Sequence, residues 1–132
     1  MNYFGPSESQ IPNVLISIDS IRIEQVLANL VNNALKHTST GDEISIDITL
    51  EDNHLKVMIA DTGEGMLPQD MPFVFQRYYQ GSERTSHNTL PQEGTGLGLS
   101  ICKYIIEVHQ GTIAFQSKKD EGTIFYFTLP LL

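Results

Sequence analysis

The sequence predicts a single α/β domain in which helices cover one face of a β-sheet. Two segments, 20–38 and 94–109, repeat apolar residues at helical spacing. Between them, residues 44–51 alternate apolar and polar side chains, and residues 55–60 return as a partner strand after an Asp-Asn turn. Because only one face of this hairpin is apolar, helices should lie over that face. A length of 132 residues with 40% hydrophobic content fits one globular domain.

Residues 20–38 should form an amphipathic helix with an unusual polar face. Asn29 and Asn33 stand one turn apart on that face, and amide side chains in this register suit a hydrated cation and its phosphates. Asparagine is a poor helix former, so its presence costs helix stability. A merely solvated face would explain the pattern about as well. The apolar stripe consists of Ile23, Leu27, Leu30 and Ala34, and the polar arc consists of Gln25, Asn29, Asn32, Asn33 and Lys36.

A carboxylate followed by two glycines ends the second strand of the hairpin. In Asp61-Thr62-Gly63-Glu64-Gly65 the glycines allow the backbone to approach a ligand closely. A common turn would also produce this pattern. Asp-Thr-Gly occurs in aspartic proteases too, but their catalysis needs two such carboxylates, and this chain carries one copy.

A second glycine-rich segment, 94–99, opens the helix that runs to about residue 109, with Ile101, Ile105 and Val108 on its buried stripe. Unpaired N–H groups at such a helix start form an anion site. The segment is not a P-loop, because no Gly-Lys-Ser/Thr is present. It is not a dinucleotide fingerprint either, because Leu99 replaces the third glycine and no apolar strand precedes it.

The remaining segments predict a short first strand, a lid and two closing strands. Residues 14–18 are apolar and β-branched, residues 66–79 read as a Pro-bounded helix or turn, and residues 112–116 and 123–129 read as strands. Residues 80–93 are polar and lack apolar periodicity, which favours a lid over a site, with plain disorder as the alternative.

Composition excludes several classes of partner. A formal net charge of -8 argues against nucleic acid or an anionic membrane surface. A bound polyphosphate would therefore need metal, backbone amides and a few placed cations. The lone Cys102 lies in a helical segment and is expected to be an inert packing thiol in a reducing compartment. No signal peptide or membrane span is visible. We expect a linker, a tag remnant or the cut end of a longer chain at 1–12, and one globular domain at 13–132.

Five motifs, in order, resemble the ATP-binding catalytic domain of sensor histidine kinases, in the GHKL superfamily. The N box is similar to EQVLANLVNNALKHT, the G1 box to DTGEG, the F box to PFVFQRYYQG, the G2 box to EGTGLGLSI and the G3 box to EGTIFYF. The match covers about residues 13–130. The resemblance implies the Bergerat fold, which is a two-layer α/β sandwich with a mixed β-sheet packed against helices and a flexible ATP lid.

The same resemblance implies roles for residues at the matching positions. Asn33 would bind Mg²⁺, with Asn29 as a catalytic residue and possible second ligand, and Lys36 and His37 would approach the phosphates and the nucleotide. Asp61 would accept a hydrogen bond from the adenine amino group. Other nucleotide-binding positions would be Gly63, Gly65, Tyr79, Gly94, Thr95, Gly96, Leu97, Gly98, Leu99 and Thr123. The F box departs from the family pattern at Gln76 and Gln80, and Glu93 replaces a frequent glycine, which leaves Arg77 or Arg84 as the candidate catalytic cation.

Asn29 also bears on the reaction. Related gyrase- and chaperone-type ATPases carry Glu at this position, because an attacking water needs a general base, whereas a neutral imidazole is already nucleophilic. We therefore expect transfer of the γ-phosphate of ATP to a histidine on a separate dimerisation and phosphoacceptor domain, and indirectly to a response regulator. An anti-sigma-type serine kinase and a non-catalytic nucleotide-sensing domain are the alternatives. The isolated domain is expected to be a cytoplasmic monomer without direct membrane contact. Its own histidines are not expected to accept the phosphoryl group, and these are His37, His54, His87 and His109.

Overall fold

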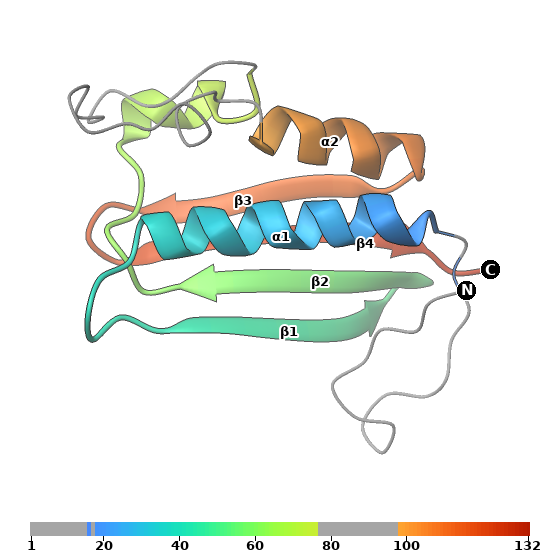
Figure 1. The fold of residues 1–132 in the computed structure, drawn as a ribbon, viewed down its shortest axis with the longest axis horizontal. Helices are drawn as coiled ribbons and strands as arrows, with labels where there is room; N and C mark the ends of the chain where they lie inside the picture. Colours follow the sequence, from blue (N-terminus) through green and yellow to red (C-terminus); the bar gives the residue numbers. More distant parts are fainter. Residues whose placement is uncertain (1–15, 17, 77–97) are drawn as a thin grey trace.

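The computed structural model describes residues 16, 18–76 and 98–132, which form a two-layer α/β sandwich. Figure 1 shows two helices lying side by side over one face of a four-stranded sheet. The elements are α1 (Ser20–Lys36), β1 (Ile44–Glu51), β2 (His54–Asp61), the 3-10 helix η1 (Pro68–Phe73), α2 (Gly98–Val108), β3 (Thr112–Lys118) and β4 (Gly122–Pro130). The predicted fold class is confirmed. Neither described α-helix has the length and apolar character needed to cross a membrane.

Helix α1 begins and ends with defined caps. The Asp19 side chain accepts a hydrogen bond from the Arg22 N–H at 3.3 Å. The helix ends at Lys36, two residues before the predicted end at Thr38, and His37 is its C-cap. Its buried face is rotated slightly from the prediction, because Val26 is fully buried while Leu27 is only partly buried. The other predicted stripe residues are buried: Ile23, Leu30 and Ala34.

The sheet is ordered β1-β2-β4-β3, and all of its described pairings are antiparallel. The β1–β2 turn is tight because Asp52 and Asn53 both adopt positive φ, at 49° and 66°. The resemblance implied a mixed sheet, which would need a parallel strand as well. Of the expected strand at 14–18, only Ile16 and Ile18 are described, and neither belongs to a strand.

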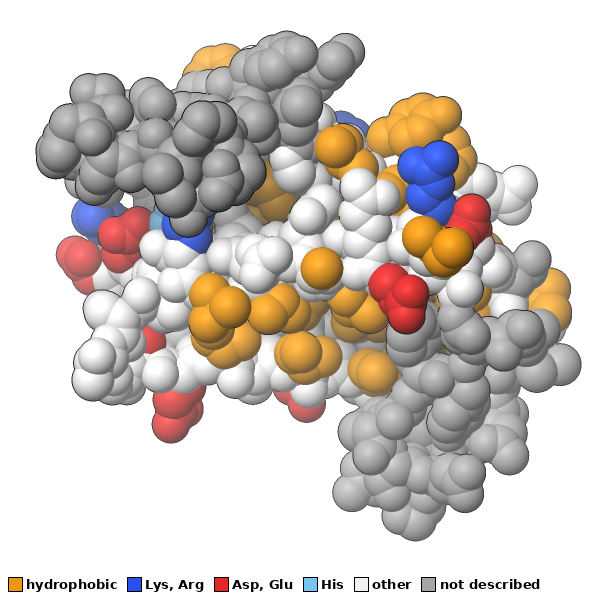
Figure 2. Space-filling model, viewed as in Figure 1, with side chains coloured by type: hydrophobic (Ala, Val, Ile, Leu, Met, Phe, Trp, Pro, Cys, Tyr) orange, Lys and Arg blue, Asp and Glu red, His pale blue; other side chains and the backbone are white. Residues whose placement is uncertain are grey.

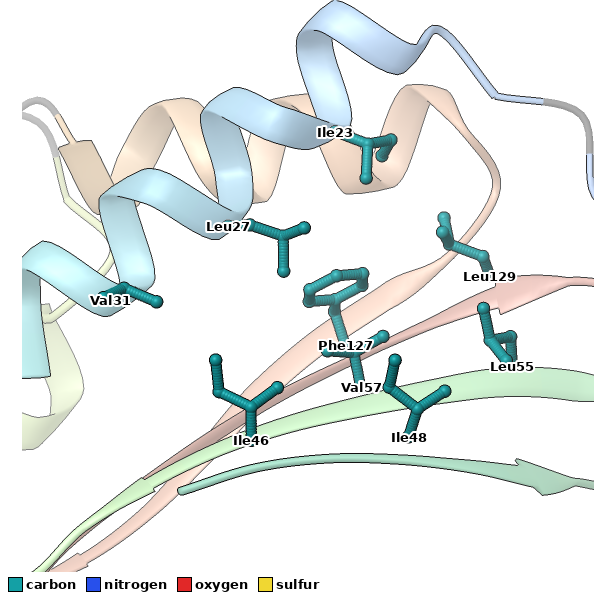
Figure 3. Close-up of a pocket in the computed structure, with 9 residues that line it drawn as sticks. All are labelled: Ile23, Leu27, Val31, Ile46, Ile48, Leu55, Val57, Phe127 and Leu129. Atoms are coloured by element: carbon teal, nitrogen blue, oxygen red, sulfur yellow. The ribbon is translucent and has the colours of Figure 1, made fainter. Parts of the chain in front are cut away.

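Burial along β1 differs from the prediction of a half-buried strand. Ile46 and Leu50 are 51% and 37% exposed, because β1 lies at the edge of the described sheet, while Ile44 and Ile48 are partly covered. An apolar groove of about 140 Å³ lies between α1 and the hairpin, and hydrophobic side chains gather along this face in Figure 2. Figure 3 shows the groove residues: Ile23, Leu27, Val31, Ile46, Ile48, Leu55, Val57, Phe127 and Leu129.

Helix α2 packs beside α1 and is tied to its start. The Asp19 N–H donates to His109 Nε2 at 3.0 Å, just beyond the end of α2. Ile105 is buried as predicted, but Val108 is 57% exposed, which corrects the predicted stripe. The buried face of α2 instead passes through Cys102 and Ile106. The packing of α2 against α1 places the start of α2 beside the middle of α1, where the candidate site lies.

Candidate functional site

The polar face of α1 forms one side of the candidate site. Asn29, Asn33 and His37 follow one another at four-residue intervals and therefore share a helix face. Asn29 Nδ2 donates to the Gly98 carbonyl at 3.4 Å, and His37 contacts Glu64 in the loop after β2. The face therefore runs from the start of α2 to the end of β2. Asn33 lies between these two contacts and is partly buried, unlike its exposed neighbour Asn32.

Asp61 lies at the end of β2, directly across from the end of α1. Its side chain is buried, with 7% of the residue exposed, and Oδ1 accepts a hydrogen bond from the Gly63 N–H at 2.9 Å. Oδ2 accepts no hydrogen bond from the described residues. A carboxylate has several lone pairs, so this group can still accept a hydrogen bond from a ligand.

The glycines after Asp61 allow three segments to pack tightly. A Cβ at Gly63 would lie 2.2 Å from the His37 carbonyl oxygen, and one at Gly65 would lie 2.1 Å from the Lys118 carbonyl oxygen. Gly65 also has a φ of +70°, which glycine adopts readily. The loop is thus wedged between the end of α1 and the β3–β4 turn, which fixes the position of the Asp61 carboxylate.

Thr123 is positioned by a residue that the sequence reasoning missed. Thr123 is a cross-strand neighbour of both Asp61 and Ser117, and its hydroxyl lies 2.7 Å from Ser117 Oγ. Ser117 Oγ also accepts from the Met66 N–H at 2.9 Å. Ser117 therefore joins β3, β4 and the loop after Asp61. Its pairing with Thr123 depends on strand register, which the separate strand patterns did not show.

Part of the predicted site lies outside the described residues. These positions are Arg77, Tyr79, Arg84, Gly94, Thr95, Gly96 and Leu97. Gly98 and Leu99 form the first residues of α2, where Leu99 packs against the core, and Lys36 is exposed in the last turn of α1. The structure thus brings together Asn29 and Gly98 at one end of the site, and His37, Asp61 and Gly63 at the other.

The chemistry of the described groups fits a nucleotide with Mg²⁺ better than a metal held by the protein alone. Among residues 16, 18–76 and 98–132, no three His, Cys, Asp or Glu side chains converge on a possible metal position. Amide oxygens such as Asn33 Oδ1 are hard donors, and Mg²⁺ is usually held by one or two protein groups together with phosphates. The apolar groove in Figure 3 lacks polar lining residues and cannot serve a polyphosphate.

Cys102 is not part of this chemistry. Burial raises the pKa of the thiol to about 11, and its Sγ donates to the Val26 carbonyl at 3.8 Å. The thiol therefore stays protonated and unreactive at neutral pH.

Two helices on one face of a sheet, with an asparagine-bearing helix that ends beside the loop after Asp61, are features of an ATPase-type nucleotide-binding domain. The chain belongs to the family of histidine kinase-, DNA gyrase B- and HSP90-like ATPases, which matches residues 18–132. The family predicted from the five motifs is therefore confirmed.

Similar proteins include a sensor protein and the solved structures of histidine kinases. The sensor protein SrrB of Staphylococcus aureus is 42% identical over 114 residues, which cover 86% of this chain and 19% of SrrB. The mycobacterial sensor histidine kinase MprB has a TM-score of 0.77 and 26% identity, with 90% of this chain and 78% of that chain covered. The catalytic domain of the histidine kinase ThkA has a TM-score of 0.75 and 30% identity, with 92% and 75% covered. The chain spans about a fifth of the length of its curated relative.

Proposed function

We propose that this domain binds Mg·ATP and transfers the γ-phosphoryl group to a histidine on a separate dimerisation and phosphoacceptor domain. The observation that carries the proposal is the α1 face with Asn29, Asn33 and His37, which spans the distance between the start of α2 and the Asp61 loop. In a two-component system the phosphoryl group would then pass to a response regulator. Membership of a family that contains histidine kinases supports this assignment, and we place the domain on the cytoplasmic side of a longer sensor kinase.

Among the described residues, one group would bind the adenine base of ATP and another would bind its phosphates through Mg²⁺. Asp61 Oδ2 would accept a hydrogen bond from the adenine amino group, beside a wall formed by Gly63 and Gly65. Asn33 would offer its amide oxygen to Mg²⁺, which when bound neutralises phosphate charge. The wedged loop holds Asp61 in place before the ligand arrives, so little ordering is needed on binding.

Transfer to histidine, rather than to water, follows from the group at position 29. An amide cannot take a proton from an attacking water, and Asn29 is also held by the Gly98 carbonyl. A neutral imidazole nitrogen already has a free electron pair, so it attacks phosphorus directly while the bond to the ADP oxygen breaks. The remaining requirements are alignment and charge neutralisation, to which the proposed positions Arg77, Arg84 and Lys36 would contribute.

The binding half of the proposal can be tested with two adjacent asparagines. Asn33→Ala should weaken Mg·ATP binding about tenfold in calorimetric titration, the loss expected for one interaction with a charged partner. Without Mg²⁺, the difference from the wild type should shrink. Asn32→Ala is the matched control, because Asn32 is exposed on the same helix. Equal effects of the two substitutions would reject the assignment of Asn33.

A further inference from the structure

Glu64 is held against the end of α1 by both its backbone and its side chain. Its N–H donates to the His37 carbonyl at 3.1 Å, and its Oε2 lies 2.7 Å from His37 Nδ1. On the other side, the Glu64 carbonyl accepts from the Asp120 N–H at 2.7 Å. The backbone of Glu64 is therefore fixed between α1 and the β3–β4 turn. Only the rotamers of its own side chain remain to be ordered when the carboxylate contacts His37.

This contact determines which ring nitrogen of His37 carries the proton. An ionised carboxylate only accepts hydrogen bonds, so Nδ1 must be the donor. Nε2 occupies the other side of the ring, pointing away from Glu64, and makes no hydrogen bond within the described part of the chain. Nε2 is therefore left for a ligand on the α1 face that also carries Asn33.

The charge of Glu64 would otherwise oppose the ligand. The chain has a net charge of -8, Asp61 lies three residues away, and ATP is itself an anion. An isolated carboxylate beside that ligand should weaken binding. A half-exposed contact of this kind alone adds little to stability, and the side chains of His37 and Glu64 are 39% and 52% exposed.

We propose that Glu64 is a positioning residue for nucleotide binding, which fixes His37 in its Nδ1-protonated form and directs Nε2 toward the bound nucleotide. The inference rests on the proposed function. If Glu64 acted only through its negative charge, its removal should tighten ATP binding. If Glu64 positions His37, its removal should weaken ATP binding.

The test compares Glu64→Ala with Glu64→Gln by calorimetric titration with Mg·ATP. Glu64→Ala should weaken binding about three- to fivefold, in the upper range for half-exposed pairs. Glu64→Gln should bind at least as tightly as the wild type, because its amide oxygen still accepts from Nδ1 while the charge is gone. Glu51→Ala is the control, because the Glu51 side chain is 55% exposed, much like that of Glu64, and Oε1 lies 3.6 Å from Lys56 Nζ toward the opposite end of β2. That control should not weaken binding.

The tautomer gives a second readout that a purely structural role would not change. Nitrogen-15 NMR of the imidazole should show the Nδ1-protonated form of His37 in the wild type and in Glu64→Gln, and a mixture of tautomers in Glu64→Ala. Tighter or unchanged ATP binding by Glu64→Ala, or an unchanged tautomer, would overturn the inference alone. A wild-type domain that binds no ATP would overturn the proposed function together with it.

Discussion

A methyl group at position 63 should damage the candidate site and the fold together. In Gly63→Ala the new Cβ would lie 2.2 Å from the His37 carbonyl oxygen and 3.0 Å from Asp61 Oδ1. Because the first neighbour is backbone, the loop must move away from α1. That movement would weaken two hydrogen bonds, from the Gly63 N–H to Asp61 at 2.9 Å and from the Glu64 N–H to His37 at 3.1 Å. With about 1 kcal/mol for each bond and a similar or larger cost of overpacking, we expect a destabilisation of about 3 kcal/mol.

Urea denaturation measures this loss, and Gly98→Ala is its matched control. A Cβ at Gly98 would have its nearest neighbour, Asn29 Cγ, at 3.8 Å, which is an ordinary contact. Gly98→Ala should therefore be as stable as the wild type or slightly more stable, because alanine favours the helix. Gly63→Ala should also lose ATP affinity, since Asp61 is displaced. A Gly63→Ala domain that unfolds at the wild-type urea concentration would refute the close-packing argument.

Three further substitutions test the core, the buried thiol and the adenine contact. Ile59 and Ile46 are direct cross-strand partners but are 2% and 51% exposed, so Ile59→Ala should cost about 2–4 kcal/mol in urea denaturation and Ile46→Ala less than about 1 kcal/mol. Burial raises the pKa of Cys102 from 9.0 to about 11, so stability should be fully present below pH 9 and fall by roughly 3 kcal/mol as pH rises through 11. Cys102→Ala should remove that loss, and an unchanged alkaline profile would contradict it. Asp61→Asn should weaken ATP binding more than GTP binding, because the amide can present its NH₂ group to the adenine amino group; equal losses would reduce Asp61 to a turn residue.

The hairpin was the most predictable part of the fold, because its signals are local. Alternation at period two defined β1, and the Asp52-Asn53 turn fixed the register with β2, so the predicted bounds agree with the structure within one residue. The motif order also predicted the family correctly.

The burial of individual side chains could not be predicted to the same accuracy, because it depends on which helix or strand packs over each residue. The alternation of β1 is the same at Ile46 and Ile48, yet Ile46 is 51% exposed while Ile48 packs against the core, because this edge strand is covered unevenly along its length. Likewise, Val108 fits a helical stripe but lies at the end of α2 and remains exposed.

Contacts between distant segments explain what was missed in the site. Glu64 and His37 are 27 residues apart, and Met66 and Ser117 are 51 residues apart. No local pattern reports such pairs, since they arise only when the loop after β2 packs against α1 and β3. The glycines of that loop indicated a close approach, but not the partner of that approach.

The most direct test of the central claim is phosphoryl transfer from γ-labelled ATP with Mg²⁺ to the proposed dimerisation and phosphoacceptor domain. We predict label on a histidine of that acceptor, with an acid-labile and base-stable linkage, and no stable label on this domain incubated alone. Label on serine, vigorous ATP hydrolysis without any partner, or ATP binding without transfer would contradict the assignment as a histidine kinase.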